Sequence, residues 1–197
     1  MTRLAPADPK DLPPGLADAF KDAEALMGFT ANDVLTMARW PDFLLAVKGL
    51  VDVVYAPGAL EPGLKRLIGA VVSGAAGCRY CQAHAAHGAV THAGVDPAKL
   101  EAVWSFETDN RFTPAERATL RLAQAAGVSP NAATDTHFHD LQAHFSEQAI
   151  LEIMGVISLF GLLNRWNQTV DTDLETAPSA FLATPATGAP KTPGAVE

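Results

Sequence analysis

The sequence predicts an all-α fold in a single domain. Apolar residues recur at the i, i+3, i+4 and i+7 positions of a buried helix face between Leu64 and Ala75. Gly and Pro divide the chain into segments of helical length. Only the valines at 51, 53 and 54 would allow a strand, and no partner strand is evident nearby. The 197 residues suffice for one well-buried domain and are rather few for two.

The first half of the chain is expected to form five helices. Glycines and prolines set most of their ends: Pro41 separates the second helix from the third, Gly74 and Gly77 break the chain before Cys78, and Gly94 suits a C-terminal cap. The expected helices span residues 18–27, 32–38, 42–55, 63 to about 75, and 78 to about 93.

Capping signals define the helices of the second half. Asp96 and Pro97 suit the N-cap and first position of a helix that runs to about residue 105. Thr113-Pro114-Ala115-Glu116 is a capping box that opens a helix to about residue 126. A helix over 134–145 follows, and Ser146 caps the longest, from 147 to about 172. Residues 176–197 are rich in Ala, Pro and Thr and are expected to be disordered.

The charge and the apolar segments exclude several classes of partner. The net charge of −8 and pI near 5.1 would repel a phosphate backbone, so no nucleic acid partner is expected. Residues 1–10 contain no apolar core of a signal peptide. The longest apolar stretch, 149–163, contains Glu152 and is shorter than the roughly 20 residues that span a bilayer. We therefore expect a soluble, cytoplasmic protein without a membrane partner and without a structural disulfide.

The segment Cys78-Arg79-Tyr80-Cys81-Gln82-Ala83-His84 concentrates the reactive side chains and contains both cysteines of the chain. On a helix the two thiols lie on one face, close enough to form a disulfide or to share a metal. Cys78 falls in the first turn, where free backbone N–H groups favour a thiolate, and Arg79 adds positive charge. His84, three residues after Cys81, can take a proton from it.

This arrangement suits a dithiol that reduces a hydroperoxide. One thiolate attacks the peroxide, the sulfenic acid condenses with the second thiol, and a dithiol reductant reopens the disulfide. Two other interpretations stay open. Cys78, Cys81 and His84 supply only three of the four ligands of a structural zinc, and His87 could join only with strain. Alternatively, the cysteines pack as small apolar residues. We expect no metal or other cofactor.

Three motifs resemble the AhpD-like, or carboxymuconolactone decarboxylase-like, superfamily, and most of all its peroxidase-related members. The resemblance covers about residues 40–172. It rests on Leu64-Lys65-Arg66-Leu67-Ile68 with Gly77-Cys78-Arg79-Tyr80-Cys81, on Phe112-Thr113-Pro114-Ala115-Glu116-Arg117-Ala118, and on Phe145-Ser146-Glu147-Gln148 with Asn164-Arg165-Trp166-Asn167.

The resemblance implies a domain organisation and an activity. It implies an AhpD-like helical domain, which we place over 40–175, in an obligate homo-oligomer (dimer, trimer or hexamer). We expect residues 1–39 to form an N-terminal helical arm before it. The resemblance also implies a thiol-dependent hydroperoxidase in which Cys81 attacks, Cys78 resolves and His84 handles the proton. A lactone decarboxylase of the same fold, which uses acid–base chemistry, is the rival enzyme. A non-catalytic helical oligomer, acting as a redox sensor or a metal-binding module, is the rival from another class.

Two positions depart from the family pattern. The family histidine lies four residues after the second cysteine, where this chain has Ala85, so His84 is one position early. Arg66 stands where the family has a relay glutamate, and it cannot act as a base, although it could stabilise a thiolate. Further assisting candidates are His87, Tyr80 and Glu152, the last of which needs a partner such as Arg117 or Arg165. The glutamates that could replace the relay residue in space are Glu61, Glu107, Glu116 and Glu152.

Overall fold

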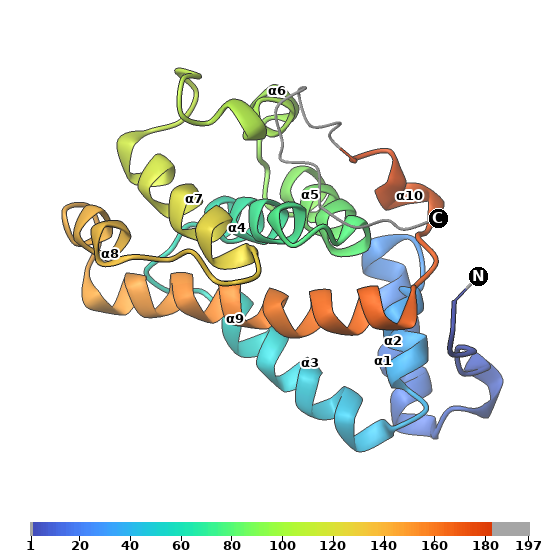
Figure 1. Cartoon of the computed structure of the whole chain (residues 1–197). Helices are drawn as coiled ribbons and strands as arrows, with labels where there is room; N and C mark the ends of the chain where they lie inside the picture. Colours follow the sequence, from blue (N-terminus) through green and yellow to red (C-terminus); the bar gives the residue numbers. More distant parts are fainter. Residues whose placement is uncertain (1, 183–197) are drawn as a thin grey trace, which may run out of the picture.

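The computed structural model describes residues 2–182 and confirms the all-α prediction, since those residues contain helices and no strand (Figure 1). The α-helices are α1 (Pro14–Met27), α2 (Asn32–Met37), α3 (Pro41–Tyr55), α4 (Pro62–Ala75), α5 (Arg79–Thr91), α6 (Pro97–Glu101), α7 (Pro114–Gly127), α8 (Asp135–Gln142), α9 (Glu147–Val170) and α10 (Thr176–Ser179). The described residues also contain two short 3₁₀ helices, η1 (Pro9–Asp11) and η2 (Val103–Ser105).

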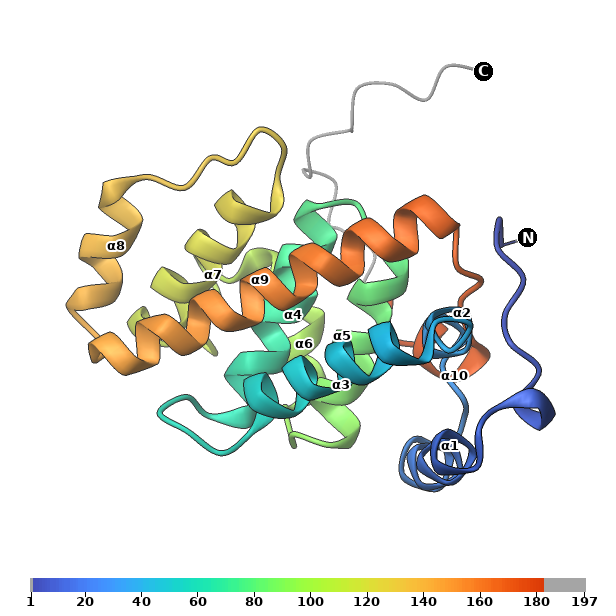
Figure 2. The ribbon, with the colours of Figure 1, turned by 90° about the horizontal axis from the view of Figure 1, so that it is seen from below.

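Helix α4 lies at the centre, packed against α5, α7 and α9 (Figures 1 and 2). Its apolar stripe is buried from Leu64 to Val72, with Ile68 and Val71 inaccessible to solvent, as the periodicity of the sequence predicts. Gly127 lets α7 approach α4, because a Cβ there would lie 2.6 Å from the backbone oxygen of Val72. Gly69 likewise leaves room for the ring of Phe160 on α9, which a Cβ at this position would meet.

Helix α9 is the long core helix across which the other elements pack. It contacts α3, α4, α5, α7 and α8 and buries Ile153, Val156 and Leu159 completely. By length and composition alone it could cross a membrane. Its place against five other helices accounts for its apolar composition as that of a core helix.

The N-terminal helices form a second, smaller core. Helices α1, α2 and α3 meet at one end of the molecule (Figure 2). Their buried apolar residues are Leu16, Phe20, Leu35, Met37, Ala38, Leu44 and Val47. The expected arm therefore packs against the domain, and its first helix begins at Pro14 rather than at residue 18.

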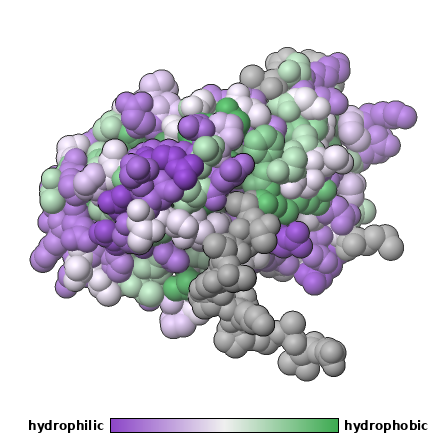
Figure 3. Space-filling model, turned by 90° about the horizontal axis from the view of Figure 1, so that it is seen from above, coloured by the Kyte–Doolittle hydropathy of each residue, from purple (hydrophilic) through white to green (hydrophobic). Residues whose placement is uncertain are grey.

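The chain after α9 returns over α5. Asp171 adopts a left-handed conformation (φ 60°) that ends α9, and α10 then packs against α5. The sequence placed the start of a disordered tail at residue 176, whereas residues 176–179 form α10. The rest of that prediction, residues 183–197, lies outside the described residues. Seen from above, hydrophobic surface gathers right of the centre of the molecule, while the left part is mostly hydrophilic (Figure 3).

Candidate active site

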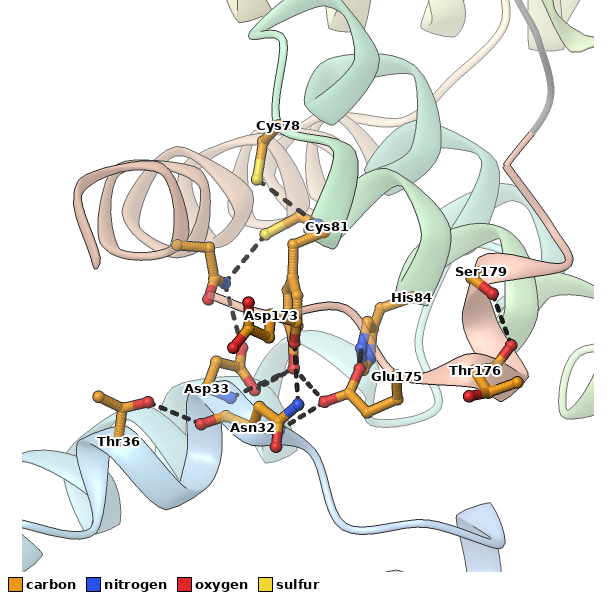
Figure 4. Close-up of polar contacts among 12 residues, drawn as sticks. Asn32, Asp33, Thr36, Cys78, Cys81, His84, Asp173, Glu175, Thr176 and Ser179 are labelled. Carbon is orange, nitrogen blue, oxygen red and sulfur yellow. Dashed lines mark hydrogen bonds and ion pairs between the residues drawn. The ribbon is translucent and has the colours of Figure 1, made fainter. Parts of the chain in front are cut away.

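The start of α5 positions both cysteines. Gly77 turns the chain with a left-handed φ of 74°, and Cys78 follows as the N-cap of α5. The Sγ of Cys78 accepts a hydrogen bond from the backbone N–H of Cys81 at 3.5 Å (Figure 4). Both thiols are free and buried, with 2% of Cys78 and 3% of Cys81 exposed. The predicted placement of the CxxC motif at the start of a helix is therefore confirmed.

Asn167, near the end of α9, is the polar side chain bonded to Cys81. Its amide Nδ2 donates to the Sγ of Cys81 at 3.2 Å and to Oδ2 of Asp33 at 3.1 Å. Only 2% of Asn167 is exposed, and these two bonds offset the cost of burying its NH2 group, whereas its Oδ1 is buried without a partner among the described residues. Asn167 belongs to one of the family-like motifs of the sequence, which gave no sign that it would reach the thiols.

The pKa values of the two thiols are shifted in opposite directions. A hydrogen bond from the side chain of Cys81 is the main cause that lowers the pKa of Cys78, and the backbone N–H of Cys81 adds to it against the effect of burial. Burial raises the pKa of Cys81 well above its usual value, and the hydrogen bond and charge of Cys78 raise it further, while Asn167 opposes the rise. Cys78 is thus the more acidic thiol of the pair, and Cys81 donates a hydrogen bond to it.

Glu175, just before α10, pairs with His84 and Tyr80. Its Oε2 lies 2.7 Å from Nε2 of His84, and its Oε1 accepts the Tyr80 hydroxyl at 2.8 Å and the backbone N–H of Asn32 at 2.5 Å. Burial pushes the pKa of Glu175 upward, but the hydrogen bond and charge of His84 outweigh it and hold the pKa below the usual 4.5. Figure 4 shows His84 and Glu175 facing one another.

Tyr80 links this pair to the thiols. Its ring stacks on His84, with centroids 4.3 Å apart, and its hydroxyl lies 3.1 Å from Oδ1 of Asp33. Burial, followed by the charges of Asp33 and Glu175, raises the pKa of Tyr80, so the phenol stays protonated. A continuous set of polar contacts therefore runs from Cys81 through Asn167, Asp33 and Tyr80 to Glu175.

The remaining assisting candidates lie apart from the thiols. His87 packs edge-on against the rings of Phe29 and Phe181. Its pKa is lowered by burial first, and then by the charges of His92, His84 and Arg66. The guanidinium of Arg66 sits over the ring of Tyr55, 4.0 Å from its centroid, and forms no hydrogen bond with either cysteine.

Glu152 is bonded to the loop before α4 and makes no hydrogen bond to the cysteines or to His84. It forms an ion pair with the buried Lys65 at 3.1 Å, not with Arg117 or Arg165, and accepts the backbone N–H groups of Ala59 and Leu60. These backbone hydrogen bonds, together with Lys65, lower the pKa of Glu152 to about 2.

The other three glutamates also lie elsewhere. Glu116 closes the capping box of α7 and pairs with Lys99, Glu107 pairs with Arg121, and Glu61 is the exposed N-cap of α4. The carboxylate that contacts the family-like histidine is Glu175 instead. It lies beyond the C-terminal motif, and the sequence around it carries no signal that would have assigned it to the site.

Among the described residues, no three His, Cys, Asp or Glu side chains come together as metal ligands. The zinc interpretation placed Cys78, Cys81 and His84 around one ion. His84 is instead hydrogen-bonded to Glu175, and Cys81 to Asn167.

A largely apolar cavity of about 1180 Å³ lies between the N-terminal helices, α3 and α5. Of the two thiols, only that of Cys81 lines it. Tyr80 and His84 add polar groups to the same wall, whereas Met37, Leu44 and Phe160 are among its apolar residues. A small molecule in this cavity would meet Cys81 first, which fits Cys81 as the attacking residue and Cys78 as the residue behind it.

Comparisons with known proteins identify relatives of this chain. The model of the carboxymuconolactone decarboxylase family matches residues 41–125. YnjA of Escherichia coli (strain K12), an uncharacterized protein, is 30% identical over 145 residues, which are 71% of this chain and 79% of YnjA.

Solved structures are similar over nearly the whole chain. The debrominase Bmp8, solved both without ligand and as a cysteine-to-alanine variant with 2,3,4-tribromopyrrole, is 37% identical, with a TM-score of 0.84 over 92% of this chain and 96% of Bmp8. The AhpD core of a peroxidase-related protein from Ralstonia eutropha JMP134 is 22% identical, with a TM-score of 0.81 over 94% of this chain and 98% of that one. The similarity to the Ralstonia eutropha protein shows a shared fold.

Proposed function

The chain belongs to the carboxymuconolactone decarboxylase family, within the AhpD-like superfamily, and from this premise we propose that it is an enzyme that reduces a hydroperoxide with Cys81 and Cys78. One observation carries the proposal: Cys81 alone of the two thiols lines the cavity, and it is flanked by an amide donor and by a more acidic thiol. A lactone decarboxylase would have no use for this paired arrangement.

The first step oxidises Cys81. Its proton passes to the Cys78 thiolate, and the N–H of Asn167 stabilises the new thiolate. The Cys81 sulfur bonds to the terminal oxygen of the hydroperoxide, and the O–O bond breaks. The alkoxide takes a proton and leaves as an alcohol, and Cys81 becomes a sulfenic acid. We assign that proton to His84, which lines the cavity and is held by Glu175.

The second step forms the disulfide. Cys78 returns to the thiolate state that its lowered pKa favours, and it attacks the sulfenic sulfur. The S–S bond forms, the S–O bond breaks, and the hydroxide leaves as water after taking a proton. A dithiol reductant, a protein or a small molecule, then returns both cysteines to thiols and is itself oxidised to a disulfide.

The likeness to Bmp8 favours a second candidate, the reductive removal of bromine from an aromatic ring. The same dithiol supplies the two electrons. The carbon–bromine bond breaks, carbon takes a proton, bromine leaves as bromide, and the two thiols become a disulfide with release of one net proton. Both candidates share the attacking residue and differ only in the electrophile.

A coupled assay decides between them. Purified protein with excess dithiothreitol is offered cumene hydroperoxide or 2,3,4-tribromopyrrole, beside C81S and, as a matched control, R165Q on the exposed side of α9. We expect turnover of the hydroperoxide that C81S abolishes and R165Q retains. Bromide release without peroxide turnover would select the second candidate. Background rates with both compounds would refute both.

We also propose that the protein is a homo-oligomer, as the family resemblance implies. Exposed apolar side chains lie along α3 (Leu45, Leu50 and Val53) and at Leu151 on α9, and they are the surfaces that an oligomer would cover. Light scattering coupled to gel filtration would measure a mass that is a multiple of 20.7 kDa, and a monomer at micromolar concentration would contradict this.

A further inference from the structure

Arg66 is a cation at the cavity wall. Among the side chains that the structure describes, no carboxylate lies at ion-pair distance from it. The guanidinium rests on the ring of Tyr55 and against Gly88 of α5, where a Cβ would come within 3.0 Å of it. By contrast Lys48, which also lines the cavity, is paired with Asp52 at 2.6 Å.

Tyr55 provides an unused donor at the same place. Its ring lines the cavity, and its hydroxyl oxygen is buried without a hydrogen-bond partner among the described residues. Burial raises the pKa of Tyr55 against the opposing effect of the nearby Arg66, so the hydroxyl keeps its proton. A buried hydroxyl without a partner costs free energy that a bound acceptor would recover.

Arg66 faces no unpaired carboxylate among the described residues that line the cavity. His92 lines the cavity, and His87 lies close enough for the charges of His92 and Arg66 to lower its pKa, after burial. The nearby carboxylates, Asp33 and Glu175, are already bonded to Asn167, Tyr80 and His84. This end of the cavity therefore favours an anion.

The distance between this end and the thiol is set by α5. Cys81 and Gly88 both line the cavity and are seven residues apart, which is two turns and about 10 Å of helix rise. Apolar side chains, Leu44 and Phe160 among them, line the cavity as well. A ligand that reaches both Cys81 and Arg66 must have an apolar body of that length.

We propose that the substrate is a small organic monoanion: a carboxylate or similar head binds Arg66 and the Tyr55 hydroxyl, and an apolar body carries the reacting group to Cys81. This deepens the proposed function and rests on it for the identity of the reacting group. The anion site itself stands on the placement of Arg66, Tyr55 and Gly88.

Binding of an unreactive pair of probes tests the site independently of turnover. Octanoate and octan-1-ol share a chain length and differ in head-group charge. Calorimetric titration would use the C78S/C81S protein, which cannot react, in its unmodified form and with R66Q or K48Q added. We expect octanoate to bind more tightly than octanol, R66Q to weaken octanoate about 10- to 100-fold, as for a lost charge-assisted hydrogen bond, and K48Q to change neither probe.

A second variant keeps the guanidinium and moves it. G88A places a Cβ against Arg66, so octanoate should bind more weakly and octanol as before. Equal affinity of octanoate and octanol for the parent protein, or equal octanoate affinity in R66Q and its parent, would overturn the anion site. If the site is confirmed while neither peroxide nor bromide turnover is found, the proposed function fails and the anion site stands.

Discussion

Replacing Asn167 by leucine should raise the pKa of Cys81. Leucine keeps nearly the same volume in this buried position and removes the N–H that donates to the sulfur at 3.2 Å. A hydrogen bond to a charged group is worth about 1.5–3 kcal/mol, and about 1.4 kcal/mol corresponds to one pH unit. The pKa of Cys81 should therefore rise by about one to two pH units, and its reactivity at neutral pH should fall about 10- to 100-fold.

The rate of alkylation by iodoacetamide, followed by mass spectrometry across pH, measures this change. The C78S background leaves one thiol, so the profile belongs to Cys81 alone. N164L is the matched control, because Asn164 is another buried asparagine, one turn earlier on α9, without a hydrogen bond to either thiol. Superimposable profiles for C78S and C78S/N167L would refute the stabilisation of the thiolate by Asn167.

Two further predictions concern stability and are read from urea denaturation. Because the pKa of Glu175 is held below 4.5 in the folded state, its carboxylate stabilises the fold above that pH, and E175Q should cost about 1.5–3 kcal/mol near pH 7. The difference should shrink as the pH falls below about 4.5, and a constant difference down to about pH 3 would contradict the bond to His84. G127A should destabilise the protein by about 1–3 kcal/mol, because its Cβ would meet the backbone oxygen of Val72. G155A, with only an ordinary contact at 3.8 Å, should be neutral or stabilise by up to about 1 kcal/mol, and equal losses in the two variants would count against the close packing of α7 on α4.

The fold was largely predictable because its signals are local. The 3.6-residue stripe of α4, the capping box at Thr113 and the glycine at 77 each act within one or two turns, and the helices begin and end close to the expected residues. The first helix was placed too late because Pro14 at its first turn was not used as a start signal.

The thiols were predictable for the same reason, and their polar surroundings were not. The spacing of Cys78, Cys81 and His84 fixes their places on α5. Their partners Asn167 and Glu175 come from segments 86 and 91 residues away, and no periodicity or spacing relates such distant positions. The candidates for a replacement glutamate were therefore those at 61, 107, 116 and 152, and the one that binds His84 was missed.

The order in which the two thiols react is the central claim, and a single-turnover experiment tests it most directly. C78S and C81S are each mixed with one equivalent of cumene hydroperoxide, and the sulfenic acid is trapped with dimedone and located by mass spectrometry. The cavity predicts that Cys81 in C78S is oxidised faster than Cys78 in C81S. Faster oxidation of Cys78 in C81S would contradict that order and would make the more acidic thiol the one that attacks.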